Sequence, residues 1–124
     1  MKNAIEFNPY SKACPSREVL GEVGNLWSVL IIVSLSDGPL RFGQLQSRIE
    51  GISNRMLTQT LRNLERDGLI LRTQLPEVPP RVEYSLTDLG THMLKPLSQV
   101  EKWVLQYMPQ IMENREKYDA IVAE

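Results

Sequence analysis

The sequence predicts a mainly α-helical single domain with one small β-hairpin. Apolar residues recur at helical spacing through most of the chain, as Leu57, Leu61 and Leu64 do. The apolar period shortens to two only between residues 69 and 86, where two short runs flank a proline-rich segment. The 124 residues are 42% hydrophobic, enough for one core, so we expect one domain over residues 1–124.

The first forty residues predict two helices. Pro15 suits the first turn of a helix over residues 15–23, and Gly24 interrupts that helix. The next helix, over residues 26–35, is apolar around most of its circumference and is expected to be buried on most sides. The first helix has an apolar stripe of Val19, Leu20 and Val23, and the second carries Leu26, Trp27, Val29, Leu30, Ile31, Val33 and Leu35.

A helix-turn-helix arrangement is predicted over residues 41–67. A short helix over residues 41–49 and a longer one over residues 53–67 are joined by a tight connection that contains glycine. Ser53 can cap the second helix, and Gly68 can adopt the left-handed conformation that ends it. Helical hairpins of this kind also occur in proteins that never meet DNA.

The helix over residues 53–67 has two different faces. Its leucines lie on one side, at the spacing of a core-facing stripe. Its other side carries side chains that can hydrogen-bond base edges and phosphates. The alternative for this stretch alone is an ordinary surface helix with a solvated face. The polar side consists of Asn54, Arg55, Thr58, Gln59, Arg62, Asn63 and Arg66.

The hairpin is predicted from two strands, over residues 69–74 and 81–86. They are joined by residues 75–80, whose three prolines make a stiff tip. A hairpin directly after a helix-turn-helix is the layout of a winged helix. Its tip, flanked by Arg81, would reach along the DNA backbone or into a minor groove. The alternative is a hairpin that merely covers the helix ends.

The C-terminal third predicts further helix. Thr87 is expected to cap a helix whose apolar stripe runs to Pro109 with a bend at Pro96, followed by an amphipathic segment over residues 110–122. A domain this small has little core left to cover so much apolar helix surface. We therefore expect a second copy of the chain to cover it, the alternative being packing within one chain against the helix that contains Trp27.

Charge is distributed unevenly along the chain. The net charge is -1, so bulk electrostatics does not favour nucleic-acid binding. Residues 41–84, however, hold 7 basic and 5 acidic residues, whereas residues 1–40 hold 3 and 4, and residues 85–124 hold 4 and 6. All seven basic residues of the centre are arginines, which suit bidentate recognition of phosphate and guanine.

Several classes of function are excluded. Cys14 and His92 are the only residues of their kinds, so one chain can form neither a disulfide nor a Cys/His zinc site. No nucleophile–base arrangement, glycine-rich phosphate loop or metal-spaced cluster is present, so we expect neither an enzyme nor a cofactor. The chain starts without an apolar signal core, and its longest apolar run, residues 26–35, is too short to span a bilayer. We expect a cytoplasmic protein with no membrane partner.

Between residues 14 and 87 the chain contains a series of short motifs that together are typical of one protein family. They are Cys14-Pro15, Gly24-Asn25-Leu26-Trp27, Asp37-Gly38-Pro39-Leu40-Arg41-Phe42, Gly51-Ile52-Ser53, Met56-Leu57-Thr58, Leu61-Arg62-Asn63-Leu64-Glu65, Asp67-Gly68-Leu69 and the segment from Pro76 to Thr87. On these motifs the chain resembles the HxlR-type transcriptional regulators, a branch of the MarR-like winged-helix proteins. The resemblance runs from Cys14 to about Gly90. Two positions depart from the family pattern. Leu75 stands where the family often has an aromatic residue, and Asn54 stands where a longer amide is common.

The resemblance implies a homodimeric transcriptional regulator that binds double-stranded DNA sequence-specifically. It is expected to be a repressor that binds a pseudo-palindromic operator. It implies a recognition helix over residues 53–67, a wing over residues 69–86, and dimerisation helices over about 15–23 and 88–122. Some members sense electrophiles or oxidants through a cysteine placed like Cys14, although relatives with no known redox function also have it. The expected DNA-contacting residues are Arg41, Ser53, Asn54, Arg55, Thr58, Gln59, Arg62 and Arg81.

The competing hypothesis is a winged helix that binds a protein partner and no DNA, which the acidic pI permits. The face of Arg55, Gln59 and Arg62 discriminates between the two, because a protein-binding module would be freer to make that face apolar. The operator and any small-molecule effector stay open.

Overall fold

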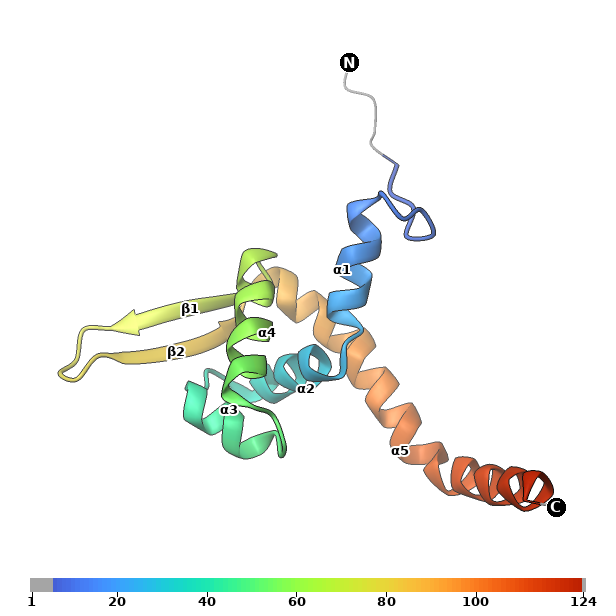
Figure 1. The fold of residues 1–124 in the computed structure, drawn as a ribbon. Coiled ribbons are helices and arrows are strands. Elements are labelled where there is room, and N and C mark those ends of the chain that lie inside the picture. Colours follow the sequence, from blue (N-terminus) through green and yellow to red (C-terminus); the bar gives the residue numbers. More distant parts are fainter. Residues whose placement is uncertain (1–5, 124) are drawn as a thin grey trace.

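The fold is mainly helical with one antiparallel hairpin, as predicted. The computed structural model describes residues 6–123, and Figure 1 shows the hairpin projecting from a helical body while the end of the last helix extends away from that body. The elements are α1 (Pro15–Val23), α2 (Leu26–Ser34), a short 3-10 helix η1 (Leu35–Asp37), α3 (Phe42–Arg48), α4 (Asn54–Arg66), β1 (Ile70–Leu75), β2 (Arg81–Leu86) and α5 (Asp88–Val122).

Capping side chains set the starts of α4 and α5. The Ser53 hydroxyl accepts a hydrogen bond from the Met56 N–H at 3.0 Å, at the first turn of α4. The Thr87 hydroxyl accepts one from the Gly90 N–H at 3.1 Å, at the first turn of α5. Gly68, with φ 77°, takes the left-handed conformation after α4, as predicted. These local contacts are readable from residue types alone.

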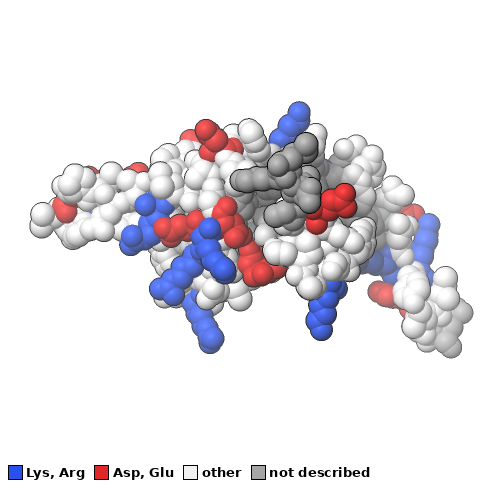
Figure 2. Space-filling view, turned by 90° about the horizontal axis from the view of Figure 1, so that it is seen from above, with Lys and Arg blue, Asp and Glu red and all other residues white. Residues whose placement is uncertain are grey.

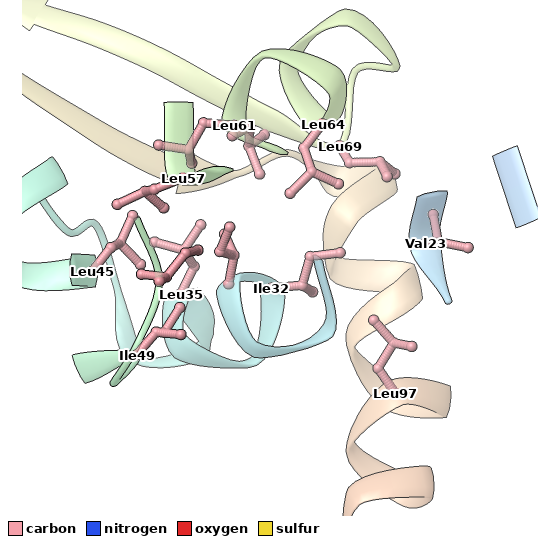
Figure 3. Close-up of a cluster of buried hydrophobic side chains, with 13 residues drawn as sticks. Val23, Ile32, Leu35, Leu45, Ile49, Leu57, Leu61, Leu64, Leu69 and Leu97 are labelled. Atoms are coloured by element: carbon pink, nitrogen blue, oxygen red, sulfur yellow. The ribbon is translucent and has the colours of Figure 1, made fainter. Parts of the chain in front are cut away.

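The core lies between α2 and α4 and is closed by the start of β1 and by the first half of α5 (Figure 3). The leucine stripe of α4 is fully buried in it, which confirms the predicted inner face of that helix. The core consists of Val23, Ile31, Ile32, Leu35, Leu45, Ile49, Ile52, Leu57, Leu61, Leu64, Leu69, Ile70 and Leu97.

The hairpin is attached to the helix-turn-helix by a short third segment of β structure. Leu40, just before α3, donates its N–H to the Tyr84 carbonyl at 2.9 Å, and Tyr84 donates its own N–H to the Leu40 carbonyl at 2.8 Å. Within the hairpin, Arg72 of β1 pairs with Tyr84 of β2. The bridge therefore holds the wing in a defined position beside α3 and α4.

The start of α5 passes very close to the start of β1. A Cβ atom added to Gly90 would lie 2.0 Å from the Leu69 carbonyl oxygen, so only glycine fits there. The Thr87 hydroxyl also donates to the Gly68 carbonyl at 2.5 Å. These contacts fix the direction in which α5 leaves the domain.

Helix α5 is continuous through Pro96 and Pro109 to Val122, because a proline's fixed φ is compatible with a helix and its cost is local. Two details of the sequence prediction were wrong. Leu26 is 59% exposed rather than buried, because it lies at the first turn of α2, outside the core. The first strand is shifted by one residue and includes Leu75.

Candidate nucleic-acid interface

Helix α4 presents an exposed polar face directly opposite its buried leucines. Arg55, Gln59 and Arg62 are all exposed on this face. The faces point in opposite directions because the two sets of residues are about half a turn apart on a helix with 3.6 residues per turn. The side chains that pack cannot point outward, so burial of the leucines orients the arginines.

Neighbouring amides hold the two ends of this polar face. At the start of α4 the Gln46 side-chain amide contacts the Asn54 side-chain oxygen, which joins α3 to α4. One turn further on, the Gln59 amide donates to the Asn63 side-chain oxygen at 3.1 Å. Thr58 is half-buried beside them, and Ser53 is occupied as the helix cap. Asn54 and Gln59 are therefore positioned before any partner arrives.

A groove of about 420 Å³ separates α4 from the wing, and arginines line both of its sides. Arg62 comes from α4 and Arg72 from β1, with Thr58 and Tyr84 between them. Glu65 lies in the same groove and offsets part of the positive charge. Sequence reasoning did not select Arg72; the arginine bias of residues 41–84 was the available signal, but only the hairpin register places Arg72 across from Arg62.

A second hollow, of about 400 Å³, lies between the start of α3 and the wing tip. Arg41 lines it from the α3 side, and Arg81 lines it from β2. The Gln44 side chain accepts the Arg41 backbone N–H at 2.9 Å, which fixes the turn that carries this arginine. The structure thus brings together two predicted contact residues that are forty positions apart in the chain.

The charge of Arg81 is partly neutralised within the wing. Its Nη1 lies 3.7 Å from Glu77 Oε1, and its Nε lies 3.6 Å from Glu83 Oε1. Both contacts are ion pairs whose distances are too long for hydrogen bonds. The Arg81 Nε atom is buried and has no hydrogen-bond partner among the described residues. Arg81 is therefore a weaker cation toward a ligand than Arg55 or Arg62.

Basic and acidic side chains are interspersed over the surface. Figure 2 shows blue and red side chains side by side in the middle of the molecule, with no continuous basic field on that face. This agrees with the net charge of -1. Any attraction to an anionic polymer therefore depends on the local arginines and not on the whole-molecule charge.

Cys14 lies immediately before α1, as its N-cap residue. Its Sγ accepts the Asn8 backbone N–H at 3.3 Å and lies 3.1 Å from the Ser16 hydroxyl. Hydrogen bonding to the Ser16 hydroxyl, and then to the Asn8 and Ser16 backbone N–H groups, lowers the pKa of the Cys14 thiol below its usual value. The half-exposed sulfur therefore has raised thiolate character.

A pair of carboxyl groups joins α1 to the end of α4. Hydrogen bonding to Asp67 raises the pKa of Glu22 to about 7, helped by burial and by the negative charges of Asp67 and Glu18, while Arg66 opposes the shift. Asp67 Oδ2 is buried and receives no hydrogen bond from an N–H or hydroxyl group of the described residues. A proton on Glu22 is therefore the donor available to it.

Within residues 6–123, no group of three or more His, Cys, Asp and Glu side chains is placed to hold a metal ion. In the same residues no single helix is long and apolar enough to cross a bilayer. Helix α1 and residues 26–37 meet that criterion only as a pair bent by 64°.

The family model of the HxlR-like helix-turn-helix matches residues 22–112, which extends beyond the end of the predicted resemblance near Gly90. The HTH-type transcriptional regulator YtfH of Escherichia coli strain K12 is 42% identical over 112 residues, which cover 90% of this chain and 89% of that protein. A solved structure of ytfH from Salmonella typhimurium superposes with a TM-score of 0.84 at 44% identity, over 90% of this chain and 99% of that one. The redox regulator HypR, solved in its oxidised form, gives a TM-score of 0.70 at 35% identity, over 75% of this chain and 96% of that one.

Proposed function

This chain belongs to the HxlR-like helix-turn-helix family of transcriptional regulators, and we propose that it binds duplex DNA sequence-specifically, as a homodimer on a pseudo-palindromic operator. Membership of this family also makes it a regulator and not an enzyme. The observation that carries the proposal is the exposed face of Arg55, Gln59 and Arg62, which lies directly opposite the buried leucines of α4.

Helix α4 is the proposed reading element. An α-helix fits the major groove, where arginine bonds guanine and asparagine or glutamine bonds adenine. Arg55 lies near the N-terminal end of α4 and Arg62 near its middle, so at least one of them should reach a guanine. Asn54, Thr58 and Gln59 lie on the same side and supply the remaining polar contacts to base edges or phosphates.

The wing and the start of α3 are the proposed backbone contacts. Arg41 and Arg81 line one hollow, so both can approach the same stretch of phosphates. Ser53, at the N-terminus of α4, adds backbone N–H groups that favour a phosphate. We add Arg72 to this set, because it faces Arg62 across the groove between α4 and the wing.

The homodimer is supported by apolar surface that the domain does not cover. Val19 and Leu20 of α1 are exposed, and so is a row of large apolar side chains on α5. A second copy is the simplest cover, and two-fold symmetry then requires two half-sites in the DNA. We propose repression as the mode of action, because a bound dimer of this size acts most simply by occupying promoter DNA.

A response to oxidants or electrophiles through Cys14 is the remaining part of the proposal. Its support is the lowered thiol pKa, the half-exposed sulfur and the similarity to the redox regulator HypR. Cys14 is the residue immediately before α1, whose exposed apolar side chains we assign to the dimer, so modification there would act on the start of α1.

A mobility-shift titration on the DNA upstream of the gene tests the proposal. We expect retention of that fragment at concentrations that leave a shuffled fragment of equal length unbound. Arg62→Ala should weaken the specific complex, whereas the matched variant Lys102→Ala, which removes one positive charge from the distant part of α5, should not. Equal binding of the wild type to both fragments would indicate non-specific, electrostatic DNA binding. No binding to either fragment would favour the protein-interaction module.

A further inference from the structure

The distal half of α5 carries a seven-residue repeat of apolar side chains that the domain leaves uncovered. The positions alternate by four and three residues, the spacing of a coiled-coil seam. At its two ends, Val100 is 58% exposed and Ile121 is 71% exposed. Leu97, one step before Val100, is buried in the domain core, so the free seam starts where the core ends. We call this row the α5 seam; it consists of Val100, Val104, Tyr107, Ile111, Asn114, Tyr118 and Ile121.

The rest of the helix suits a partner along this row. Figure 1 shows the end of α5 standing away from the other elements. Pro109 lies on the side of α5 opposite the seam, so its missing N–H does not interrupt the apolar row. From Val100 to Ile121 the seam is about 30 Å long at a rise of about 1.5 Å per residue.

We propose that the α5 seam pairs antiparallel with the α5 seam of a second copy, in the register that places Glu101 beside the partner's Arg115. The proposal rests on the homodimer of the proposed function and specifies how its two α5 helices align. In this register Val100 packs on the partner's Tyr118, and Val104 packs on the partner's Asn114. The two-fold axis then makes each of these contacts twice.

Charge complementarity selects this register. In an antiparallel helix pair, the positions that flank the seam on one side face the same positions of the partner. Only one alignment places Glu101 opposite an arginine. Sliding the helices by one heptad places Glu101 opposite the partner's Met108 in one direction, and opposite the partner's Val122 in the other.

The other flank of the seam fits the same alignment. It places Trp103 opposite the partner's Lys117, whose alkyl stem and ammonium group both suit an aromatic face. Trp103 is already held against Tyr107 of its own helix, with ring centroids 5.5 Å apart. Lys117 forms an ion pair with Glu113 of its own helix at 3.0 Å.

A parallel pairing has no such support. It would place Trp103 near the partner's Met108, Gln110 near the partner's Arg115, and Lys117 near the partner's Val122. No pair of opposite charges results.

A charge-reversal cycle tests the contact between Glu101 and Arg115. Glu101→Arg and Arg115→Glu should each raise the dimer dissociation constant by roughly tenfold, since each creates two like-charge contacts, and the double variant should return it to within about threefold of wild type. Lys102→Glu, on the outer side of α5, is the control and should leave the constant unchanged. Sedimentation equilibrium measures the constants, and circular dichroism confirms that each variant is folded.

Cross-linking tests the position of the axis independently. In this register Met108 lies beside the partner's Met108, so Met108→Cys in a Cys14→Ser background should give a covalent dimer with a short bismaleimide. Gln106→Cys, on the outer side of the helix, should not. If the wild type is a DNA-binding dimer but the double variant is not rescued and Met108→Cys does not cross-link, the register is wrong and the proposed function stands. A wild-type monomer at micromolar concentration would overturn both the register and the proposed homodimer.

Discussion

At the scale of single residues, the contact between Glu22 and Asp67 makes stability depend on pH. Because the pKa of Glu22 is raised to about 7 in the folded chain, the folded state keeps a proton that the unfolded chain releases above its ordinary value of 4.5. The stabilisation is fully present below about pH 4.5 and is lost as pH rises through about 7. This contact should therefore stabilise the fold less as the pH rises through neutrality.

Glu22→Gln should flatten the pH dependence of unfolding between pH 5 and 8. The introduced amide can still donate a hydrogen bond to Asp67 and cannot ionise. At pH 8 the free energy of unfolding of the variant should therefore exceed that of the wild type by about 1 kcal/mol or less, after discounting for solvent screening. Urea unfolding at several pH values measures it, with Glu18→Gln as the control for the neighbouring charge. A slope unchanged in Glu22→Gln would show that another group titrates.

Cys14 is the second residue with a testable perturbation. The lowered thiol pKa predicts that alkylation by iodoacetamide reaches its half-maximal rate at a lower pH than for a free cysteine. Ser16→Ala, which removes the main hydrogen bond to the sulfur, should move that midpoint upward. Diamide should then change operator affinity in the wild type but not in Cys14→Ser. Equal responses in both proteins would contradict a sensor role.

At the scale of elements, the junction between β1 and α5 depends on one glycine. Gly90→Ala places a methyl group against the Leu69 backbone, which cannot move without displacing the hairpin, so we expect a loss of about 2 to 3 kcal/mol of stability. Gly43→Ala is the matched control, since Gly43 also lies in a helix but has no atom within 4 Å of an added Cβ. It should be neutral or slightly stabilising. Thermal unfolding compares the two, and similar losses would mean that the close approach has relaxed.

Helix α4 and the wing should fail in different ways when their arginines are removed. Arg55→Ala or Arg62→Ala should cost about 1 to 3 kcal/mol of discrimination between the operator and a mutated operator. Arg81→Ala should weaken binding to most sequences alike and lower the salt slope by at most about one unit, because Glu77 and Glu83 already offset part of its charge.

A binding series over operator variants and salt concentrations separates the two behaviours. Arg72→Ala belongs in the same series, and we expect it to resemble Arg81→Ala with a larger salt effect, because no ion pair to Arg72 is found within residues 6–123. If all variants lose affinity equally on every sequence, α4 binds phosphates only and is not the reading element.

At the scale of the whole molecule, the proposed two-fold dimer constrains the DNA. Two copies of α4 should meet half-sites whose centres are about one helical turn apart, or a multiple of it. Inserting about 5 bp between the half-sites should abolish tight binding, and inserting about 10 bp should restore part of it. Sedimentation of the complex should show two chains per operator. Tight binding that ignores the insertion would indicate independent monomers.

The elements and both faces of α4 were predictable from the sequence alone. Caps such as Ser53 and Thr87, the left-handed Gly68 and the leucine period act over a few residues, so their effect is readable without a fold. Neither Pro96 nor Pro109 ends α5, because a proline lowers helix stability locally but does not forbid a helix whose φ it matches.

The site itself depends on contacts between distant parts of the chain. The groove shared by Arg62 and Arg72 exists only because Leu40 and Tyr84 attach the wing beside α3, and because Gly90 lets α5 pass close to β1. The pairing of Glu22 with Asp67 likewise brings together two helices far apart in sequence. Residue periodicity describes which way a side chain points from its own element, whereas tertiary packing decides which other element it meets.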